Sequence, residues 1–596
     1  MKTHNRGRME NVDRLVQWAR SKGCYINEKL SFEYSNNHGI SCIIKESLSE
    51  DDKKGLIRVP KSLIISPELA DSFAKDYLSE VQTSSPEINT NLIFLLAKLK
   101  FDSSGKTIVE NTNLHTEYQP YIDYLPNDGK STGNPYFWTM EEKELLDGTD
   151  AHVLMKRNFL KDLENWKVVA SQLDVAKHPQ LKDELLEYEA FKMGPLGGVS
   201  VDYLLNVKEI SWTSFTAYLW ASCIISSRAF PYLLFDASAK YKNHAFLLPI
   251  VDLLNNEDSN SSKCRWTIEN NVFIFDSLDD LSKLTQSCEL YNNYGAKSNV
   301  EFLLNYGFCL KGNRDNTTTL SLKVDESVIE GAKNYGVVIP NDSSVNGINF
   351  ILRQGDKIPE NLIDFFSYLC KLTSERKGFN LRMKLEGLTQ LKAIIKTKLR
   401  TLKKLEVEVS DKVSSHHANI IKTYRKSQKD IFQQTLEQVE KMEKQLLTEF
   451  KPFSFKKAMM VDTRFFNSFL VVFGTKSYND LIEKGILDHA VLLWIMRISN
   501  KEVYEDIHDK TIFPDFIYNE FQKVKRNMKI DNDDIAEFMP MYQSLFPALC
   551  GKVPSVYNRG DWTLNSLIYA GTVADRLTYK RETNGEVFFI DPAKSK

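Results

Sequence analysis

The chain has few cysteines, and their spacing excludes two common uses. Eight cysteines are scattered over 596 residues, and no two of them stand at the CxxC spacing. A zinc ribbon and a disulfide-stapled fold are therefore excluded, and we expect free thiols in a reducing compartment. The ten histidines also lack the spacing of metal ligands. We predict no metal site.

Long hydrophobic runs are absent as well. No apolar stretch approaches the roughly 18 residues that a membrane-spanning helix needs. The first residues, MKTHNRGRMENVD, lack the apolar segment of a secretory signal peptide. The formal net charge is only −2, so the whole chain is no polyelectrolyte for nucleic acid or membrane. We expect a cytosolic protein, with the nucleus open as a second location, and no direct nucleic-acid or membrane partner.

Several catalytic signatures are also missing from the sequence. The chain contains no GxxxxGK[ST] phosphate loop, no GxSxG nucleophile elbow and no HExxH zinc motif. These absences argue against the enzyme classes that the three motifs mark. The glycine cluster GPLGGVS at 194–200 does not match a dinucleotide-binding fingerprint, and we predict a loop there.

What the chain does contain is enough apolar material for several folded units. Apolar residues make up 42% and aromatic residues 11%, and the length favours two to four units. The charge is unevenly spread, because residues 371–460 carry 21 Lys and Arg against 10 Asp and Glu, a net charge of +11. A solvated helical face is the simpler interpretation, and a surface for a charged partner is the alternative.

The N-terminal part predicts a small β-unit followed by a helical region. A helix is expected over Val12–Lys22 from its apolar face. Phe32–Tyr34, Ile40–Ile44 and Leu56–Val59 predict short strands separated by turns. From about residue 69 to 210 the spacing of apolar residues becomes helical, which indicates a mainly helical insertion.

The remainder begins with a mixed region and continues as helices. An aromatic-rich helix is predicted over 215–235, then a strand-like run FLLPIVDLL at 246–254, then a strand pair near 264–266 and 272–275. Further on, two apolar stripes run from Leu381 to Leu402 and from Ile421 to Leu446 at three- and four-residue steps. Two long helices packed as an antiparallel hairpin explain these stripes.

Three ordered segments between residues 226 and 308 resemble a known family. SSRAFPYLL, LLPIVDLLNN and ELYNNYGAKSNVEFLLNYGF resemble the SET core of the Rubisco large-subunit methyltransferase class, especially its fungal enzymes that methylate ribosomal proteins and cytochrome c. The resemblance implies an α+β fold with a SET-domain β core, a helical insertion and a mainly α-helical C-terminal substrate-binding domain. The expected parts are 12–68 and 211–312 for the core, 69–210 for the insertion and 313–596 for the helical domain.

The resemblance also implies a site for S-adenosyl-L-methionine, and no metal. Arg228 would face the methionine carboxylate of the cofactor, a task that suits a guanidinium group; the alternative is an Arg paired with a nearby carboxylate. Asn255 would hold the cofactor through its amide. Asn256 stands where the family usually has His, a position that acts largely through its backbone. The cofactor-binding residues implied near the N-terminus are Asn37, His38, Gly39 and Ile40, of which only the glycine matches the family's glycine-rich turn.

Two tyrosines are the implied catalytic residues. Tyr306 of NYGF would be the catalytic tyrosine, and Tyr294 of NNYG its companion beside the cofactor's sulfonium. A lysine has a reference pKa of about 10.4, so it must lose its proton before it can attack. A phenol oxygen can then orient the amine toward the methyl carbon, which is chiefly a positioning effect. Core packing is the alternative role for either tyrosine.

These implications add up to a function. The chain is expected to be an S-adenosylmethionine-dependent protein-lysine N-methyltransferase that acts on a basic, non-histone cytosolic protein, either a large-subunit ribosomal protein or cytochrome c. Many histone-directed SET enzymes close the lysine channel with a zinc-binding cysteine cluster, and none follows residue 308 here. In the resembled class a helical domain stands in that place, so the resemblance implies that residues 313–596 dock the substrate. Two alternatives stay open. They are a catalytically idle SET-like scaffold, favoured by Asn256, and a purely helical adaptor.

Overall fold

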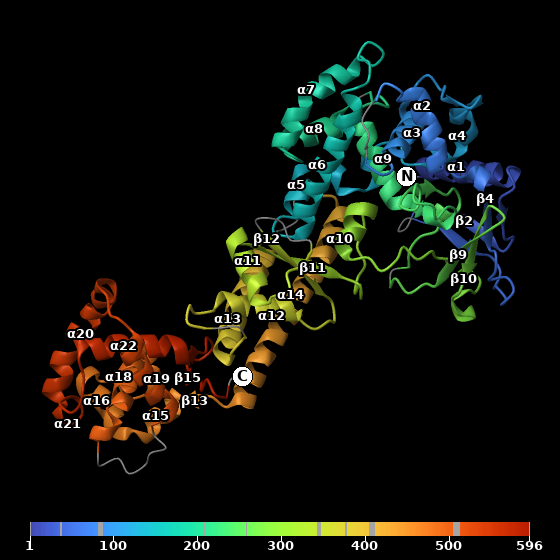
Figure 1. The fold of residues 1–596 in the computed structure, drawn as a ribbon. Helices are drawn as coiled ribbons and strands as arrows, with labels where there is room; N and C mark the ends of the chain where they lie inside the picture. The colour runs from blue at the N-terminus through green and yellow to red at the C-terminus, as the bar shows by residue number, and fades with distance from the viewer. Residues whose placement is uncertain are drawn as a thin grey trace. The chain divides into compact units, whose positions relative to one another are not determined.

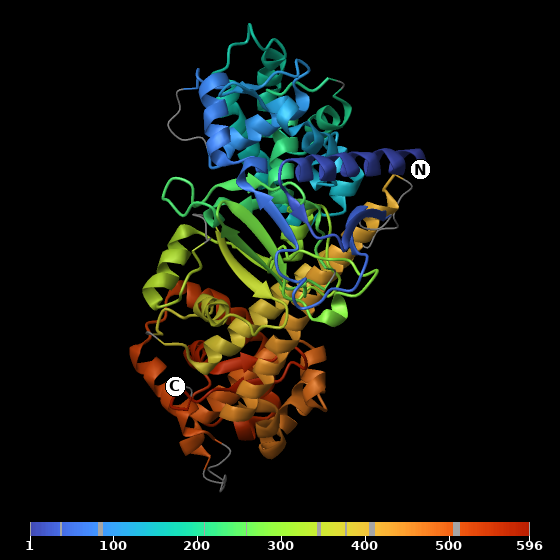
Figure 2. The same cartoon turned by 90° about the vertical axis from the view of Figure 1, so that its right-hand side faces the viewer.

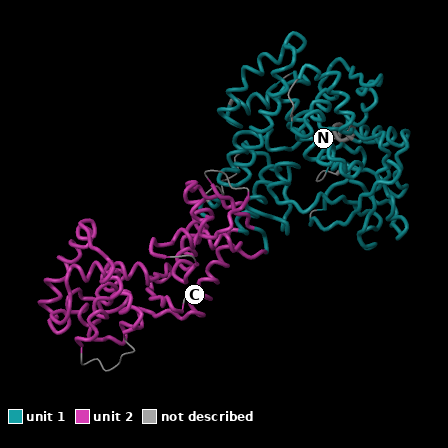
Figure 3. The backbone as a smooth tube through the Cα atoms, viewed as in Figure 1, with its two compact units in different colours: residues 1–318, 353–355, 400–431 teal, residues 319–352, 356–399, 432–596 magenta. Residues whose placement is uncertain are grey.

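The computed structural model divides the chain into two compact units, which Figure 3 distinguishes by colour. Unit 1 comprises residues 1–318, 353–355 and 400–431, and unit 2 comprises residues 319–352, 356–399 and 432–596. The residues that the structure describes are 2–35, 39–81, 87–207, 209–257, 259–341, 347–375, 378–404, 412–504 and 513–594.

Unit 1 begins with the predicted helix and strands. Helix α1 (Lys2–Ser21) starts earlier than its apolar face indicated, and it precedes β1 (Tyr25–Ile26). The strands β2 (Leu30–Ser35), β3 (Gly39–Ile44) and β4 (Ile57–Pro60) confirm the three predicted ones. β2 and β3 form an antiparallel hairpin. Gly39 and Ile40, two of the predicted cofactor-binding residues, are the first residues of β3.

The N-terminal strands are completed by strands from much later in the chain. The predicted pair is confirmed as β9 (Cys264–Glu269) and β10 (Val272–Ser277), and the sheet order is β1-β4-β10-β9. β3 is also bordered by a late segment, because the Leu290 amide donates to the Cys42 carbonyl at 2.7 Å. The two parts of the core are thus joined across the whole insertion.

The insertion is mainly helical, as its apolar spacing predicts. Its helices lie on one side of the small sheets in both views (Figures 1 and 2). They are α2 (Pro67–Tyr77), α3 (Thr90–Phe101), α4 (Leu114–Tyr124), α5 (Met140–Glu144), α6 (Asp150–Ala170), α7 (Gln180–Met193) and α8 (Gly198–Asn206), with the short strands β5 (Ile108–Val109) and β6 (Thr112–Asn113) between α3 and α4. The loop predicted at 194–200 is shorter than expected, since α8 already begins at Gly198.

Helix α9 (Phe215–Arg228) leads into the site. The Ser214 side chain accepts a hydrogen bond from the Ala217 amide and begins the helix, and nearly all its residues as far as Ile224 are buried. The helix was predicted to continue to residue 235, but it ends at Arg228 and passes into β7 (Ala229–Pro231). A proline disfavours helix in the residue before it, which explains the early end.

The run FLLPIVDLL is a strand only at its start. β8 (Ala245–Leu247) pairs with β7, and the chain then turns at Ile250, whose φ of 77° and ψ of −51° lie in the rare γ-turn region. A short 3₁₀ turn over Val251–Leu253 follows. The prediction of a longer strand was wrong because a buried apolar run looks alike in a strand and in a turn.

Unit 1 has one hydrophobic core that crosses these parts. It contains residues of the strands, the insertion and α9, and also Ile420, Ile421 and Tyr424 from a late helix. The Tyr424 hydroxyl donates to the carboxylate of Asp150 and accepts from the Ala151 amide. Residues 400–431 are therefore a structural part of unit 1.

The central helices follow the two predicted apolar stripes. The segment contains β11 (Thr317–Lys323), α11 (Glu326–Tyr335), β12 (Gly347–Arg353), α12 (Glu360–Leu369), α13 (Leu381–Lys404) and α14 (Ser415–Phe450). Within unit 1, the Arg425 guanidinium donates to the Leu402 carbonyl at 2.6 Å. Within unit 2, Lys392 lies 3.5 Å from Glu443. Glu443 lies farther along α14 than Arg425, and its partner Lys392 lies earlier in α13 than Leu402. This order of contacts is that of an antiparallel pair.

The C-terminal part of unit 2 is a helical domain with its own core around the buried ring of Trp494. Its helices are α15 (Phe455–Val461), α16 (Thr463–Phe473), α17 (Tyr478–Glu483), α18 (Leu487–Ser499), α19 (Asp515–Asn527), α20 (Asn532–Lys552), α21 (Pro554–Tyr557) and α22 (Leu564–Leu577). A small sheet orders β13 (Phe453–Ser454), β15 (Val587–Phe589) and β14 (Thr578–Lys580) side by side. This sheet joins the residues after α14 to the last strands of the chain.

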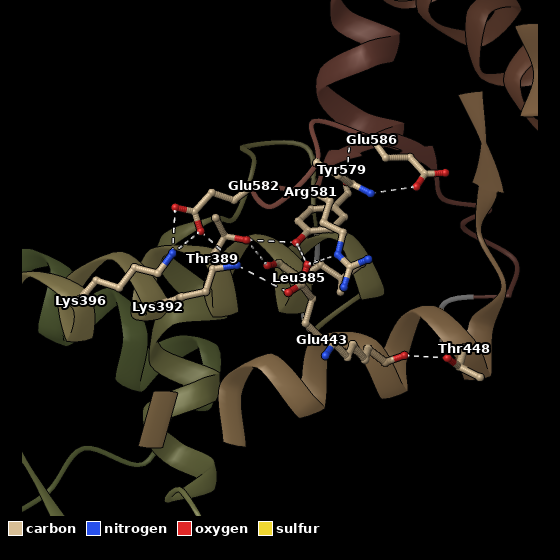
Figure 4. A network of polar contacts seen from close by, with 12 residues as sticks. Leu385, Thr389, Lys392, Lys396, Glu443, Thr448, Tyr579, Arg581, Glu582 and Glu586 are labelled. Atoms are coloured by element: carbon tan, nitrogen blue, oxygen red, sulfur yellow. Dashed lines mark hydrogen bonds and ion pairs between the residues drawn. The ribbon is translucent and has the colours of Figure 1, made fainter. Parts of the chain in front are cut away.

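A buried polar network fastens the last strands to α13 and α14 (Figure 4). At its centre is Glu443, whose side chain is only 4% exposed. Its carboxylate accepts from the Tyr579 hydroxyl at 2.9 Å and from Arg581 Nε at 3.1 Å, and Lys392 lies 3.5 Å away. Lys392 also lies 3.1 Å from Glu582. A buried charge that had lost these partners would destabilise unit 2 strongly.

All eight cysteines are free thiols, and four of them are buried. No helix within the described ranges is long and apolar enough to cross a membrane.

Candidate functional site

A cavity of about 730 Å³ lies in unit 1, in the size range of small-molecule sites. Its walls come from α1, the β2–β3 hairpin, the loop after α4, the end of α9, and the segments 252–255 and 294–308. Six of the predicted site residues line it, namely Gly39, Ile40, Arg228, Asn255, Tyr294 and Tyr306. Asn256 is not among the lining residues. The predicted positions Asn37 and His38 lie outside the described residues.

Arg228 stands at the last position of α9, where a cation also interacts favourably with the helix dipole. Its Nη1 donates to the backbone carbonyl of Asp252 at 3.1 Å and lies 3.3 Å from the Tyr124 hydroxyl. The guanidinium also lies over the Tyr124 ring, 5.2 Å from its centroid. Burial opposes the charge, but Tyr124 and Asp252 outweigh it and raise the pKa of Arg228. The group is therefore a permanent cation in the cavity wall.

Asp252 orients this arginine from behind. Its carboxylate lies 3.4 Å from Arg228 Nη1, and its side chain is 0% exposed while that of Arg228 is 22% exposed. The buried Tyr121 hydroxyl donates to the same carboxylate oxygen at 2.9 Å. Arg228 is thus paired with a carboxylate, which was the alternative role considered for it. It also lines the cavity.

Asn255 ties the late segment to the N-terminal hairpin. Its amide nitrogen donates to the Ile40 carbonyl at 2.8 Å and to the Glu289 carboxylate at 2.8 Å. Its backbone carbonyl accepts from the Asn292 amide at 2.8 Å. Asn255 therefore fixes the start of β3, which forms one wall of the cavity.

Asn256 supports the tyrosine segment from outside the cavity. Its side-chain oxygen accepts from the Tyr294 amide at 3.0 Å, and its amide nitrogen donates to the Glu257 carbonyl at 3.0 Å. The residue is only 7% exposed. The asparagine side chain therefore makes a specific contact that positions the backbone of Tyr294.

The two predicted tyrosines meet in the cavity wall. Their rings stack with centroids 4.8 Å apart and planes at 19°. The Tyr294 hydroxyl donates to the Leu254 carbonyl at 3.0 Å, and burial raises the pKa of Tyr294. Burial, with a smaller contribution from Glu301, raises the pKa of Tyr306 to about 12. Both side chains are neutral phenols at physiological pH.

Tyr306 ends an unusual turn. The short helix α10 (Asn299–Glu301) begins with a capping box between Ser298 and Glu301 and continues as a π turn over Phe302–Tyr306. Gly307, with a φ of 76°, then ends the turn in the left-handed region. π turns are rare and recur at functional sites. Within the described residues the Tyr306 hydroxyl has no hydrogen-bond partner, so it is available to a molecule in the cavity.

Three contributors to this site were not predicted. Tyr124 and Asp252 contact the guanidinium of Arg228, and Tyr121 donates to the Asp252 carboxylate. Asp252 lies inside the segment LLPIVDLLNN, so its place in that segment was an available signal. The two tyrosines lie in α4, and nothing local in the sequence links that helix to residue 228.

The cavity offers one fixed cation, neutral hydroxyl groups and backbone carbonyls. A guanidinium group suits a carboxylate ligand, and the tyrosine rings supply an apolar surface. This set of groups fits a zwitterionic amino-acid moiety attached to a larger group, as in S-adenosyl-L-methionine. No group of three or more His, Cys, Asp or Glu in the described ranges is placed to hold a metal ion.

The fold matches a solved SET-domain structure, that of Rubisco LSMT bound to AdoMet. The TM-score is 0.50, and the match covers 73% of this chain and 93% of that chain at 17% sequence identity. The fold is therefore the SET-domain methyltransferase fold with its helical C-terminal region.

Sequence comparisons then identify the family. Residues 317–450 match the model of the EFM1 middle domain. The chain is 32% identical to the protein-lysine N-methyltransferase EFM1 of Saccharomyces cerevisiae over 97% of both chains. It is 28% identical to ribosomal lysine N-methyltransferase 1 of the same yeast, over 82% of this chain and 87% of that protein. The chain belongs to this family of SET-domain protein-lysine N-methyltransferases.

Proposed function

We propose that the protein transfers a methyl group from S-adenosyl-L-methionine to the side-chain nitrogen of a lysine in a non-histone protein. The observation that carries the proposal is the presence of Arg228, Tyr294 and Tyr306 in the wall of one cavity. Family membership supports the same reaction. A purely helical adaptor would have no use for these three residues in one place.

The cofactor would be held from two sides of the cavity. Arg228, oriented by Asp252 and Tyr124, would bind the carboxylate of the methionine moiety. Gly39 and Ile40, held by Asn255, would offer backbone groups from the β2–β3 hairpin. When bound, S-adenosyl-L-methionine supplies the methyl group on its sulfonium.

The tyrosines would prepare the lysine for attack. A lysine must be neutral to act as a nucleophile, and removal of the amine from water favours its neutral form. Because the pKa of Tyr306 is raised to about 12, its hydroxyl stays protonated and places no negative charge beside the amine. The Tyr306 hydroxyl would orient the amine, and Tyr294 would hold the Tyr306 ring by stacking.

The substrate would be a folded cytosolic protein, either a large-subunit ribosomal protein or cytochrome c. One relative is named ribosomal lysine N-methyltransferase 1, which supports the first choice. The name of the yeast relative EFM1, a protein-lysine N-methyltransferase, does not say which protein carries the lysine. The helical C-terminal domain would dock the substrate, and the positive segment 371–460 would contact an acidic patch on that protein. The expected location is the cytosol, with the nucleus as a second location.

An unbiased labelling experiment tests the proposal. The purified protein is incubated with S-adenosyl-L-methionine labelled in its methyl group and with a cytosolic extract, and the labelled proteins are identified by mass spectrometry. We expect a small set of proteins labelled on lysine. The Tyr306→Phe variant serves as the control. Binding of the cofactor without labelling of any protein would reject the proposed reaction.

A catalytically idle scaffold is the second candidate, because Asn256 replaces the usual His of the family. The contact from Asn256 to the Tyr294 amide shows that asparagine supports the local backbone. We expect the wild type to be active and Asn256→His to fold and keep methyl transfer. An inert wild type combined with an active Asn256→His variant would favour the scaffold.

A further inference from the structure

The turn that carries Tyr306 is held by a segment outside the three resemblance motifs. The Asn134 side-chain amide donates to the backbone carbonyl of Leu304 at 2.6 Å, across 170 residues of sequence. Leu304 belongs to the π turn Phe302–Tyr306, and Asn134 is only 3% exposed. Carbonyls in the last turn of a helix lack intrahelical partners, so this bond satisfies a group that burial would otherwise leave unpaired.

The neighbouring residue meets the end of the same turn. A Cβ placed on Gly307 would lie 2.7 Å from the carbonyl oxygen of Gly133, which is closer than real Cβ contacts allow. The absence of a side chain at Gly307 therefore permits the two backbones to touch. The same Gly133 oxygen accepts a hydrogen bond from the buried Trp138 indole at 3.1 Å, which fixes its position. The loop is therefore held by a hydrogen bond at the point where it contacts the turn.

The loop that makes these contacts also borders the cavity. Pro126, Asn127, Ser131 and Thr132 line the cavity together with Tyr306. The loop lies between α4 and α5, inside the helical insertion, and its sequence PNDGKSTGNP predicts only turns. One segment of the insertion thus forms a wall of the cavity and holds the turn that presents Tyr306.

We propose that Asn134 is a positioning residue for Tyr306. Through the Leu304 carbonyl it sets the orientation of the π turn, and through the turn it sets the place of the Tyr306 hydroxyl. This inference rests on the proposed lysine methylation. Misplacing a reacting group by about 1 Å can cost on the order of a hundredfold in rate. We therefore expect loss of the bond to lower the rate of methyl transfer more than it lowers binding.

The variant Asn134→Asp removes the donor to Leu304 and, when ionised, places a negative charge beside that carbonyl. The Asn134 oxygen also accepts from the Tyr136 amide at 3.0 Å, and a carboxylate keeps this contact while it loses the donor to Leu304. Asn113→Asp is the matched control, since Asn113 likewise begins a helix and its amide donates to the Gly105 carbonyl at 3.1 Å. Asn113 does not line the cavity.

The readout is the single-turnover methylation rate at saturating cofactor and protein substrate. We expect Asn134→Asp to lose about ten- to a hundredfold in this rate, while cofactor affinity and KM for substrate change by less than about threefold. Asn113→Asp should keep the wild-type rate. Trp138→Phe removes the indole donor to Gly133 and also leaves space in the core, since Trp138 is 1% exposed. This variant should lose a few-fold in rate, and it serves if Asn134→Asp does not fold.

The pH dependence gives a second readout of the bond itself. In the Asn134→Asp variant the introduced carboxyl group, once protonated, could again donate to the Leu304 carbonyl. The rate of this variant relative to wild type should therefore recover as the pH falls from about 9 to about 6, since buried carboxyl groups titrate above their usual range.

Two results would overturn the inference. One is a folded Asn134→Asp variant with the wild-type rate. The other is a rate loss that Asn113→Asp shares at equal thermal stability. A wild type that methylates no protein would instead reject the proposed function and the inference with it.

Discussion

The ring of Tyr294 lies nearly parallel to the ring of Tyr306, with the two centroids 4.8 Å apart. The Tyr294 ring is itself held in place, because its hydroxyl donates to the Leu254 carbonyl. The stack therefore fixes the plane of Tyr306 but leaves its hydroxyl unpaired within the described residues. The packing of Tyr306 therefore depends on its ring, and its proposed role in methyl transfer depends on its hydroxyl.

Removing that oxygen should stop turnover and spare the fold. We expect Tyr306→Phe to lose on the order of a hundredfold in single-turnover methylation at saturating cofactor, because the hydroxyl no longer aligns the lysine amine. The ring and its stacking remain, so the melting temperature should change little. Tyr542→Phe, which loses a hydroxyl bonded to the Trp562 carbonyl outside the cavity, is the control. Near wild-type turnover in folded Tyr306→Phe would place the catalytic group elsewhere.

Arg228→Ala should weaken binding of S-adenosyl-L-methionine by about 1.5–3 kcal/mol, the value of a charge-assisted bond, measured by calorimetry. It should also lower stability, because the buried Asp252 carboxylate loses its cation. Arg228→Lys keeps a cation beside Asp252 but loses the planar fork, and it should recover most of the stability but only part of the affinity. Undiminished affinity in Arg228→Ala would refute the assignment.

The positive segment can be tested by charge reversal on α14. Lys422 and Lys426 are exposed and lie one turn apart. If this face docks an acidic patch of the substrate, Lys422→Glu/Lys426→Glu should raise KM for the protein substrate several-fold, more at low ionic strength. Lys182→Glu/Lys242→Glu, at exposed positions outside the segment, controls for net charge. Equal KM values in the two double variants would argue against docking on this face.

A buried carboxyl in the insertion predicts a pH dependence of stability. Burial raises the pKa of Glu184 to about 7, well above the value near 4.3 of an unfolded chain. The folded state then binds the proton more tightly, so this contribution is present below about pH 4 and is lost as the pH rises through 7. Glu184 accepts from the Phe215 amide at 3.1 Å.

Glu184→Gln keeps the oxygen that accepts from Phe215 and removes the titration. We expect the variant to match the wild type near pH 5 and to exceed it by on the order of 1–3 kcal/mol at pH 8. Thermal melts of both proteins from pH 5 to 8 measure the difference. Melting temperatures that stay a constant distance apart across this range would show that Glu184 does not titrate between pH 5 and 8.

Much of the fold could be predicted from the sequence, because short-range patterns determine it. The strands of the N-terminal unit, the pair at 264–277 and the two apolar stripes follow directly from alternation and helical spacing. The turn at Ile250 could not be predicted, because its left-handed backbone is imposed by tertiary packing that no local pattern encodes.

The residues around the site divide in the same way. Arg228, Asn255, Tyr294 and Tyr306 lie within the recognisable segments, and the structure brings them to one cavity. Tyr121 and Asn134 reach the same region from the insertion, whose sequence predicted helices and a turn-rich loop. Contacts across more than a hundred residues leave no periodic signal in the sequence, so only the folded structure connects these two residues to the site.

The sheet that joins β13 to β15 has a consequence for synthesis of the protein. Phe453 leaves the ribosome long before its strand partner Phe589, and Glu443 long before Tyr579 and Arg581. Unit 2 therefore cannot finish folding during translation until the last strands emerge. A premature stop codon that removed only these strands would leave a buried carboxylate short of partners and an open sheet edge. We expect chaperones and proteases to act on such a truncated product, because its core and sheet edge would be exposed.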